Sequence, residues 1–150
     1  MTSPLTDLQF NLSHTHGIAL IALARARPIG VDVEEVRPFA EVENLPRRIF
    51  SVRELQTFRD LPPSDRQAAF FRAWTRKEAV VKATGLGFSM NVQEVEVTFS
   101  PDADARLLEW PATPPAREWT LREVEIPSGY VAAVAVPGQI RKLLVKGSVF

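Results

Sequence analysis

The chain has 150 residues, about the length of one domain, and 45% of its residues are hydrophobic while 24% are charged. Its 18 basic and 18 acidic residues cancel, which argues against a general nucleic-acid-binding protein. The absence of cysteine and the presence of only two histidines exclude a disulfide framework, a cysteine nucleophile and a three-histidine zinc site.

Residues 1–9 are polar and are expected to form a loose lead-in to a domain over residues 10–150. They carry neither the basic region nor the apolar region of a signal peptide. The longest apolar run near the front, residues 18–24, is far shorter than the roughly 20 residues that span a bilayer. We therefore expect a cytosolic protein that does not insert into membranes.

Two strands are predicted early in the chain, over residues 18–24 and 29–34, and the turn between them predicts that they pair as a hairpin. A helical stretch is predicted over residues 40–49. Ser51 and Glu54 have the spacing of a capping box, which opens a short helix that ends near residue 59.

The longest predicted element is a helix over residues 65–84, which Ser64 and Gln67 would cap and Gly85 would end. Alternating residues predict a strand over 92–99, and two further strands are expected near 118–125 and 130–136. Residues 139–150 are ambiguous. Strands, then helices, then strands indicate an α+β fold.

Three segments carry candidate chemistry. In Gly-Val-Asp-Val-Glu, residues 30–34, Asp32 and Glu34 point to one face of a strand, because side chains alternate. Two carboxylates roughly 7 Å apart on a strand repel each other unless a cation joins them. They predict a Mg²⁺ site or, as the simpler alternative, a solvated acidic face on an edge strand.

The second segment lies on the long predicted helix. Glu78 and Lys82 share one helix face, and Trp74 lies one turn earlier. The pair is either a surface salt bridge beside a core tryptophan, or a third acidic group with a lysine that holds a phosphate. In the second interpretation Glu78 ligates the metal or acts as a general base.

The third segment is Phe-Asn-Leu-Ser-His, residues 10–14. Ser13 and His14 are small, directed donors suited to phosphate oxygens, or they belong to a capping turn. His16 is interpreted as a surface residue, since two neighbouring histidines are weak support for a metal site.

The order of these segments is more specific than any one of them. Gly30 lies 17 positions after Ser13, and Glu78 lies 46 positions after Asp32 within the pattern F-x-x-W-T-x-K-E-A-x-x-K. On these motifs the chain resembles the 4′-phosphopantetheinyl transferase superfamily over about residues 10–136. It is most similar to the second half of the larger, Sfp-type members, which also carry a serine–histidine pair before the acidic strand.

The resemblance implies a ferredoxin-like α+β fold, with an antiparallel sheet packed against a long helix, as a single half-unit. It also implies Mg²⁺-dependent transfer of the 4′-phosphopantetheine group of coenzyme A to a serine of an apo-carrier protein (holo-acyl-carrier-protein synthase activity), with release of adenosine 3′,5′-bisphosphate. Mn²⁺ is an alternative ion. The resemblance implies that neither a nucleic acid nor a membrane takes part in the reaction.

The resemblance assigns roles only to those positions of this chain that match the family's motifs. Asp32, Glu34 and Glu78 match the acidic metal set, and Glu78 is the favoured base. Lys82 matches the lysine that contacts the diphosphate. The resemblance assigns coenzyme A phosphate contacts to Ser13 and His14, packing to Trp74, and no definite role to Lys77.

The chain departs from Sfp-type enzymes in length, because those have two similar halves with coenzyme A between them. We therefore expect a homodimer or homotrimer that recreates the missing wall. The alternatives are an impaired or truncated half-enzyme that binds metal and coenzyme A, or a subunit that pairs with a separate polypeptide. Arg47, Arg48 and Arg53 are candidates for steering an acidic carrier protein, although a solvated helix face explains them equally well.

Overall fold

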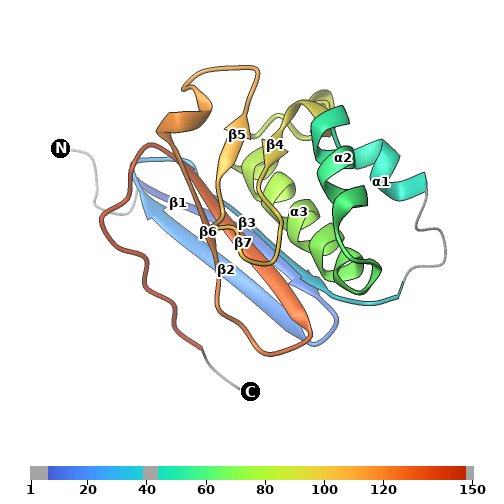
Figure 1. Ribbon diagram of the computed structural model, residues 1–150. Helices are drawn as coiled ribbons and strands as arrows, with labels where there is room; N and C mark the ends of the chain where they lie inside the picture. The colour runs from blue at the N-terminus through green and yellow to red at the C-terminus, as the bar shows by residue number, and fades with distance from the viewer. Residues whose placement is uncertain (1–6, 39–43, 148–150) are drawn as a thin grey trace.

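The computed structural model describes residues 7–38 and 44–147 (Figure 1). Its central layer is an antiparallel sheet in the order β3-β7-β6. A hairpin covers one face of this sheet, and the long helix α3 covers the other (Figure 1). The strands of these layers are β1 (Leu8–Thr15), β2 (Ile18–Arg25), β3 (Gly30–Glu35), β6 (Trp119–Glu123) and β7 (Tyr130–Pro137).

The helices gather on one side of the sheet, where α1 and α2 lie beyond α3 (Figure 1). A small second sheet, β4 with β5, also packs at this side. The α+β class expected from the sequence is confirmed. The remaining elements are α1 (Asn44–Ile49), α2 (Val52–Asp60), α3 (Pro63–Thr84), β4 (Glu96–Val97), β5 (Leu107–Glu109) and three short 3₁₀ turns, Gly87–Ser89, Val92–Glu94 and Ala116–Glu118.

Two apolar clusters hold the layers together. The larger surrounds α3, from β6 and β7 on one side to α1 and α2 on the other, and includes the stacked rings of Phe50 and Phe99, whose centroids are 5.0 Å apart. The smaller lies between the sheet and β2, where Val33 and Val134 face the inner side of the hairpin. Because both faces of β3 and β7 are covered, their residues are buried almost throughout.

The predicted hairpin of residues 18–24 with 29–34 is wrong. β2 pairs instead with β1, and β3 pairs with β7. The tight turn lies earlier, at His16 and Gly17, where Gly17 adopts a positive φ of 79° that glycine reaches without steric cost. β1 begins at Leu8, two residues before the expected start of the domain, so part of the predicted lead-in is ordered strand.

The helix ends agree with the sequence at α2 and at the C-terminal end of α3, but not at the N-terminal end of α3. The capping box of Ser51 and Glu54 is present, and Gly85 ends α3 in the left-handed conformation. The predicted Ser64 cap is wrong, because α3 begins at Pro63 and has no side-chain cap. Proline suits the first helical position, since it lacks an N–H that would have no partner there. The start of the stretch predicted over 40–49 lies outside the described residues.

The strand predicted over residues 92–99 is shorter than expected. Residues 92–94 form a 3₁₀ turn, and only Glu96 and Val97 form β4, although Val95, Val97 and Phe99 are buried as the alternation predicted. β5 was not predicted. The strands expected near 118–125 and 130–136 are confirmed as β6 and β7, while residues 139–147 form neither helix nor strand.

Gly30 allows β3 to lie directly against α3. A Cβ at this position would collide with the backbone oxygen of Ala79 and the backbone nitrogen of Ala83. Because neither backbone atom can rotate away, only glycine permits this approach. The contact brings the acidic residues of β3 within reach of the side chains on α3.

We expect Gly30→Ala to lower the free energy of unfolding by about 1–3 kcal/mol, since overpacking forces the strand and helix apart. Urea unfolding measures the change. Gly147→Ala is the matched control, because a Cβ there meets no atom within 4 Å and the variant should unfold like the original. Equal urea midpoints for Gly30→Ala, Gly147→Ala and the original protein would contradict this, because they would mean that moving β3 away from α3 does not lower the free energy of unfolding.

Among residues 7–38 and 44–147, no helix combines the length and the apolar character needed to cross a membrane.

Candidate functional site

Asp32 lies at the centre of the candidate site, on the face of β3 that meets α3. Its side chain is buried, and its Oδ1 accepts hydrogen bonds from Ser13 Oγ at 3.1 Å and Lys82 Nζ at 3.2 Å. Its Oδ2 is also buried but has no hydrogen-bond partner among the described residues. A buried carboxylate oxygen without a partner is rare, and it points to a group that binds there.

The surroundings of Asp32 favour its protonated form. Burial raises the pKa of Asp32 to about 7, and Glu34 and Glu78 add to the increase, while Lys82 opposes it. The charged form is therefore costly until a further positive charge reaches it. Such a carboxyl group is typical of a binding or catalytic position.

Glu78 and Glu34 complete an acidic group around Asp32. Glu78 is half-buried on α3, and burial raises its pKa, with Glu34 adding to the increase and Lys82 opposing it. Glu34 is half-buried on β3, and its carboxylate lies 4.0 Å from Arg37 at the surface. Each of these carboxylates affects the ionisation of another, so the strand and helix motifs meet in the folded chain.

Lys82 joins the helix motif to the strand motif. Its Nζ donates to the backbone oxygen of Val31 at 3.0 Å and to Asp32 Oδ1 at 3.2 Å. About 29% of its side chain is exposed, so the ammonium is held in place but can still be reached from solvent. The alternative of an isolated surface salt bridge between Glu78 and Lys82 is wrong, because Lys82 pairs with Asp32.

Ser13 and Asn11 attach β1 to the free edge of β3. The Ser13 hydroxyl accepts from the backbone N–H of Val33 at 3.1 Å and donates to Asp32, while Asn11 Oδ1 accepts from the N–H of Val31 at 2.8 Å. Ser13 is buried and therefore orients Asp32. Sequence reasoning assigned no role to Asn11. Once residues 8–15 are seen as a strand, its spacing of two from Ser13 places both on one face.

His14 lies on the opposite face of β1 from Ser13, since adjacent residues of a strand alternate. Its side chain is exposed, next to Ala19 on β2. His16 is also exposed, and its backbone oxygen accepts from the Tyr130 hydroxyl at 2.6 Å. The serine and histidine of the motif therefore point to different sides of the hairpin.

Lys77 faces away from the acidic group, into the interior. It is fully buried, and its Nζ contacts Glu54 at 2.6 Å and donates to the backbone oxygens of Val92 and Val95. These three acceptors satisfy all three donors of the ammonium. Lys77 thus ties α3 to α2 and to the segment before β4. Trp74 is half-buried and packs against the larger core cluster, as its predicted role requires.

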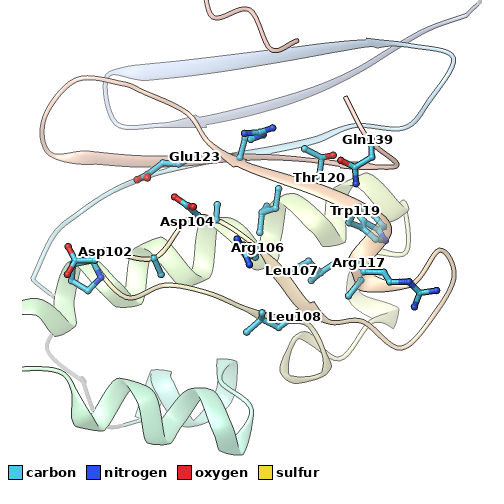
Figure 2. Close-up of a pocket in the computed structure, with 16 residues that line it drawn as sticks. Asp102, Asp104, Arg106, Leu107, Leu108, Arg117, Trp119, Thr120, Glu123 and Gln139 are labelled. Carbon is cyan, nitrogen blue, oxygen red and sulfur yellow. The ribbon is translucent and has the colours of Figure 1, made fainter. Parts of the chain in front are cut away.

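A cavity of about 400 Å³ opens beside the acidic group, with Asn11, Trp74, Glu78, Val81, Lys82 and Met90 in its wall. A larger cavity of about 990 Å³ lies between residues 101–108 and β6 (Figure 2). β6 is at the opposite edge of the sheet from β3, and the described walls of this larger cavity include neither Asp32, Glu78 nor Lys82. The smaller cavity is therefore the one that adjoins the candidate chemistry.

The acidic group fits an open site for a hard divalent cation. Within the described part of the chain, no three His, Cys, Asp or Glu side chains are grouped closely enough to enclose a metal ion. Mg²⁺ does not require such a cage, because it keeps several waters and binds through one or two carboxylates plus substrate phosphates. The unpartnered Oδ2 of Asp32 is the kind of ligand that such an ion would satisfy.

Comparisons with known proteins agree with these motifs. The sequence model of the 4′-phosphopantetheinyl transferase superfamily matches residues 28–135. The chain is 43% identical over 133 residues to the 4′-phosphopantetheinyl transferase HetI of Nostoc sp. strain PCC 7120, a match that covers 89% of this chain and 53% of HetI. The chain thus spans about half the length of this curated relative.

Two solved structures share the fold at low sequence identity. One is the holo-[acyl-carrier-protein] synthase of Thermotoga maritima, with a TM-score of 0.60 and 20% identity over 75% of this chain and 64% of that protein. The other is the ACPS–CoA complex of Chronobacterium ammoniagenes, with a TM-score of 0.53 and 20% identity over 77% of this chain and all of that protein. The expected fold is confirmed by these similarities.

Proposed function

This chain belongs to the 4′-phosphopantetheinyl transferase superfamily, and we propose that it transfers the 4′-phosphopantetheine group of coenzyme A to a serine of an apo-carrier protein. The observation that supports this most directly is the contact between Lys82 and Asp32, because it joins the helix motif to the strand motif at one place. Glu78 and Glu34 act electrostatically on the same carboxylate.

The reaction requires the carrier serine oxygen to attack the phosphorus that carries the pantetheine arm. A new O–P bond forms, the diphosphate P–O bond breaks, and adenosine 3′,5′-bisphosphate leaves. A bound Mg²⁺ or Mn²⁺, held by one or two of the carboxylates of Asp32, Glu34 and Glu78, would neutralise charge on the diphosphate. Glu78 is the proposed acceptor of the serine proton, since its raised pKa makes it a better base than an ordinary glutamate.

Three side chains are proposed to act on the coenzyme A phosphates, Lys82 and His14 by direct contact and Ser13 through Asp32. Lys82 lines the 400 Å³ cavity, and its ammonium is held in place by the backbone oxygen of Val31. Ser13 lies behind Asp32 and acts mainly through it, while His14 would approach the phosphates from the outer side of the hairpin. Positive and donor groups arranged before the reaction stabilise charge on the transferring phosphoryl group.

We propose that the carrier protein docks near α1 and α2, where Arg47, Arg48 and Arg53 are exposed. A groove of about 210 Å³ is lined by Glu34 and by Leu45 and Ile49 of α1, so α1 lies near the acidic group. Basic side chains there would attract the acidic surroundings of a carrier serine.

We predict that the protein is located in the cytosol, and cell fractionation would test this.

We propose that the chain self-associates as a homodimer or homotrimer. The second candidate function is a half-enzyme that binds metal and coenzyme A without turnover or pairs with a separate polypeptide. Coenzyme A binding by calorimetry without modification of any carrier would favour the binding module. Full activity of the purified chain would exclude the need for a separate subunit.

The proposed activity predicts that an apo-carrier protein gains the mass of one phosphopantetheine when incubated with this chain, coenzyme A and Mg²⁺. Lys82→Ala is expected to lower kcat/KM about 100-fold or more, because a positioned charge at the diphosphate is lost. Intact-protein mass spectrometry over time measures both. Arg122→Ala is the control, since Arg122 is exposed on β6 and should leave the rate unchanged.

Two results would contradict the proposal. One is the lack of any mass increase on both fatty-acid and peptide-synthetase carriers. The other is an equal rate for Lys82→Ala and the original protein, which would separate Lys82 from the chemistry.

A further inference from the structure

The larger cavity follows the free edge of β6. It measures about 990 Å³, and its wall includes every residue of β6 and the whole of segment 101–108 (Figure 2). β6 is the last strand of its sheet, since among the described strands it pairs only with β7. Pockets that hold drug-sized ligands measure roughly 300–1,000 Å³. The cavity therefore has room for a short stretch of chain beside β6.

The register of β6 with β7 fixes which backbone groups of β6 face this cavity. At one end of the ladder the Val124 N–H donates to Ala132 O at 3.0 Å, and at the other end the Gly138 N–H donates to Glu118 O at 2.7 Å. In an antiparallel pair, both backbone groups of a residue point to the same side, and the next residue points to the opposite side. The even-numbered residues of β6 therefore bond to β7, and the odd-numbered residues face away from it.

Leu121 and Glu123 thus direct their backbone N–H and C=O groups to the cavity. No described residue forms a hydrogen bond with any of these four groups. Leu121 is only 4% exposed, so water covers its backbone poorly. Unpaired backbone groups on a buried residue are rare, and on an edge strand they are a template for another strand.

The opposite wall of the cavity is held away from β6 by Thr98. The Thr98 N–H donates to Arg106 O at 3.0 Å, and the Thr98 hydroxyl accepts from the Arg106 N–H at 2.9 Å and donates to Asp104 O. These backbone groups of segment 101–108 are therefore bonded on the side of β4. They are not available to pair with β6, so the edge of β6 stays open to a guest.

The two ends of the cavity differ in charge. Figure 2 shows Asp102, Asp104 and Glu123 toward one end. Arg117 lies at the other end, just before β6 begins. Arg76 lies behind the acidic end, with its Nη2 3.8 Å from Glu123 Oε2. Among the described residues, Asp102, Asp104 and Arg117 form no ion pair within 4.0 Å, so their charges are free for a guest.

Two further arginines line the cavity without reversing this polarity. Arg106 lies near the middle of the cavity (Figure 2). Arg122 points to the opposite face of β6 from Glu123, because side chains alternate along a strand. The charge along β6 therefore changes from negative beside Glu123 to positive beside Arg117.

We propose that this cavity binds an extended peptide segment of a partner protein, which adds to the sheet as a strand antiparallel to β6. Its backbone bonds to Leu121 and Glu123, and antiparallel pairs are slightly more stable per residue than parallel ones. This direction places the first residues of the guest at the acidic end and its last residues beside Arg117. In strand addition, main-chain hydrogen bonds give affinity and side chains give specificity.

The charges of the cavity define the chemistry of the partner. Its segment begins with a lysine or arginine, continues with residues that favour strands, and ends with an aspartate or glutamate after about the length of β6. β6 and β3 lie at opposite edges of the sheet, so this site uses none of the residues around Asp32. The proposal is therefore independent of the proposed function.

A synthetic peptide tests the site directly. The probe is Lys-Val-Thr-Val-Thr-Glu with an acetylated N-terminus and an amidated C-terminus, so that only its two end side chains are charged. Hydrogen exchange of backbone amides, followed by NMR, should slow about tenfold or more at Leu121 and Glu123 when the peptide is added. The Arg122 amide is the internal control, because it already bonds to β7 and should change little.

Two matched peptides separate the backbone contribution from the charges. A version N-methylated at its two central residues lacks the central backbone donors and should give no protection. A version with its end residues exchanged, glutamate first and lysine last, should bind about fivefold more weakly or worse, since each charge then meets its like.

Glu123→Pro tests the edge from the side of the protein. The Glu123 N–H lies outside the ladder with β7, and proline is tolerated at such edge positions, so the circular dichroism spectrum should be unchanged. This variant should lose peptide binding. Glu123→Gln keeps the N–H and should retain binding, which separates the backbone donor from the carboxylate.

Protection of the Leu121 and Glu123 amides without any peptide would overturn the proposal. If that protection is independent of protein concentration, segment 101–108 closes onto β6; if it increases with concentration, a second copy occupies the edge. Binding of the N-methylated peptide, preference for the exchanged peptide, or unchanged binding by a folded Glu123→Pro variant would also contradict it.

Discussion

Asp32→Asn is expected to abolish phosphopantetheinyl transfer and, at the same time, to stabilise the fold at pH 8. The carboxylate is buried, its Oδ2 is unpartnered, and its pKa is raised to about 7 from 3.8. An asparagine keeps an oxygen for Ser13 and Lys82 without the buried negative charge. Loss of a proposed metal ligand should lower kcat/KM by about 100-fold or more.

The sign of the pH dependence follows from the proton affinity of the two states. Because the folded state holds the Asp32 proton more tightly than the unfolded state, stability is greatest below about pH 4 as far as this group is concerned. It falls as the pH rises to about 7 and is constant above that value. The full difference is on the order of a few kcal/mol.

Urea unfolding at pH 4.5 and pH 8, in buffer with a chelator, measures this contribution. The free energy of unfolding of Asp32→Asn should exceed that of the original protein by about 2–4 kcal/mol at pH 8, and the gap should shrink at pH 4.5. A variant less stable than the original at pH 8 would falsify the assignment of Asp32 as a strained, functional carboxylate.

Lys77→Met is expected to cost about 3–5 kcal/mol of stability, because it leaves the buried Glu54 carboxylate without its counter-charge. Glu54 is 4% exposed, and after the substitution its hydrogen-bond donors among the described residues would be the backbone N–H groups of Ser51 and Val97. Chemical denaturation gives the change in free energy. Lys142→Met serves as the control, since Lys142 is exposed and should alter stability by less than about 0.5 kcal/mol.

The double variant Glu54→Met with Lys77→Met separates the charge from the volume. Removing both charges should recover part of the loss, since a buried pair is costly chiefly when one partner remains. If the double variant is as unstable as the two single losses added together, the ion pair is not what Lys77 contributes.

The motif residues could be predicted from the sequence because they lie on elements with strong local signals. Alternation on a strand places Asp32 and Glu34 on one face, and helical spacing places Glu78 and Lys82 on another. The capping box of Ser51 and Glu54 could also be predicted from the sequence, since its two hydrogen bonds join residues three positions apart. Each of these patterns depends only on near neighbours in the chain.

The partner of each strand could not be predicted in the same way. Residues 8–15 alternate apolar and polar side chains as a strand does, but their start was interpreted as a polar lead-in and Ser13 and His14 as a possible capping turn. Their role as β1 depends on Gly17, which closes the hairpin, and on Asn11 and Ser13, which hold the edge of β3. The buried ion pair of Lys77 could not be predicted either, because its partner Glu54 lies 23 positions away in the chain.

The sequence by itself determined the family motifs, the α+β class and the residues that carry charge. Only the tertiary structure decided that Lys82 pairs with Asp32 across 50 positions, that Lys77 is an interior support, and that Ser13 and His14 face opposite sides. The physical reason is that periodicity and capping are local, whereas ion pairs and strand partners follow from long-range burial, which forces distant segments to share one core.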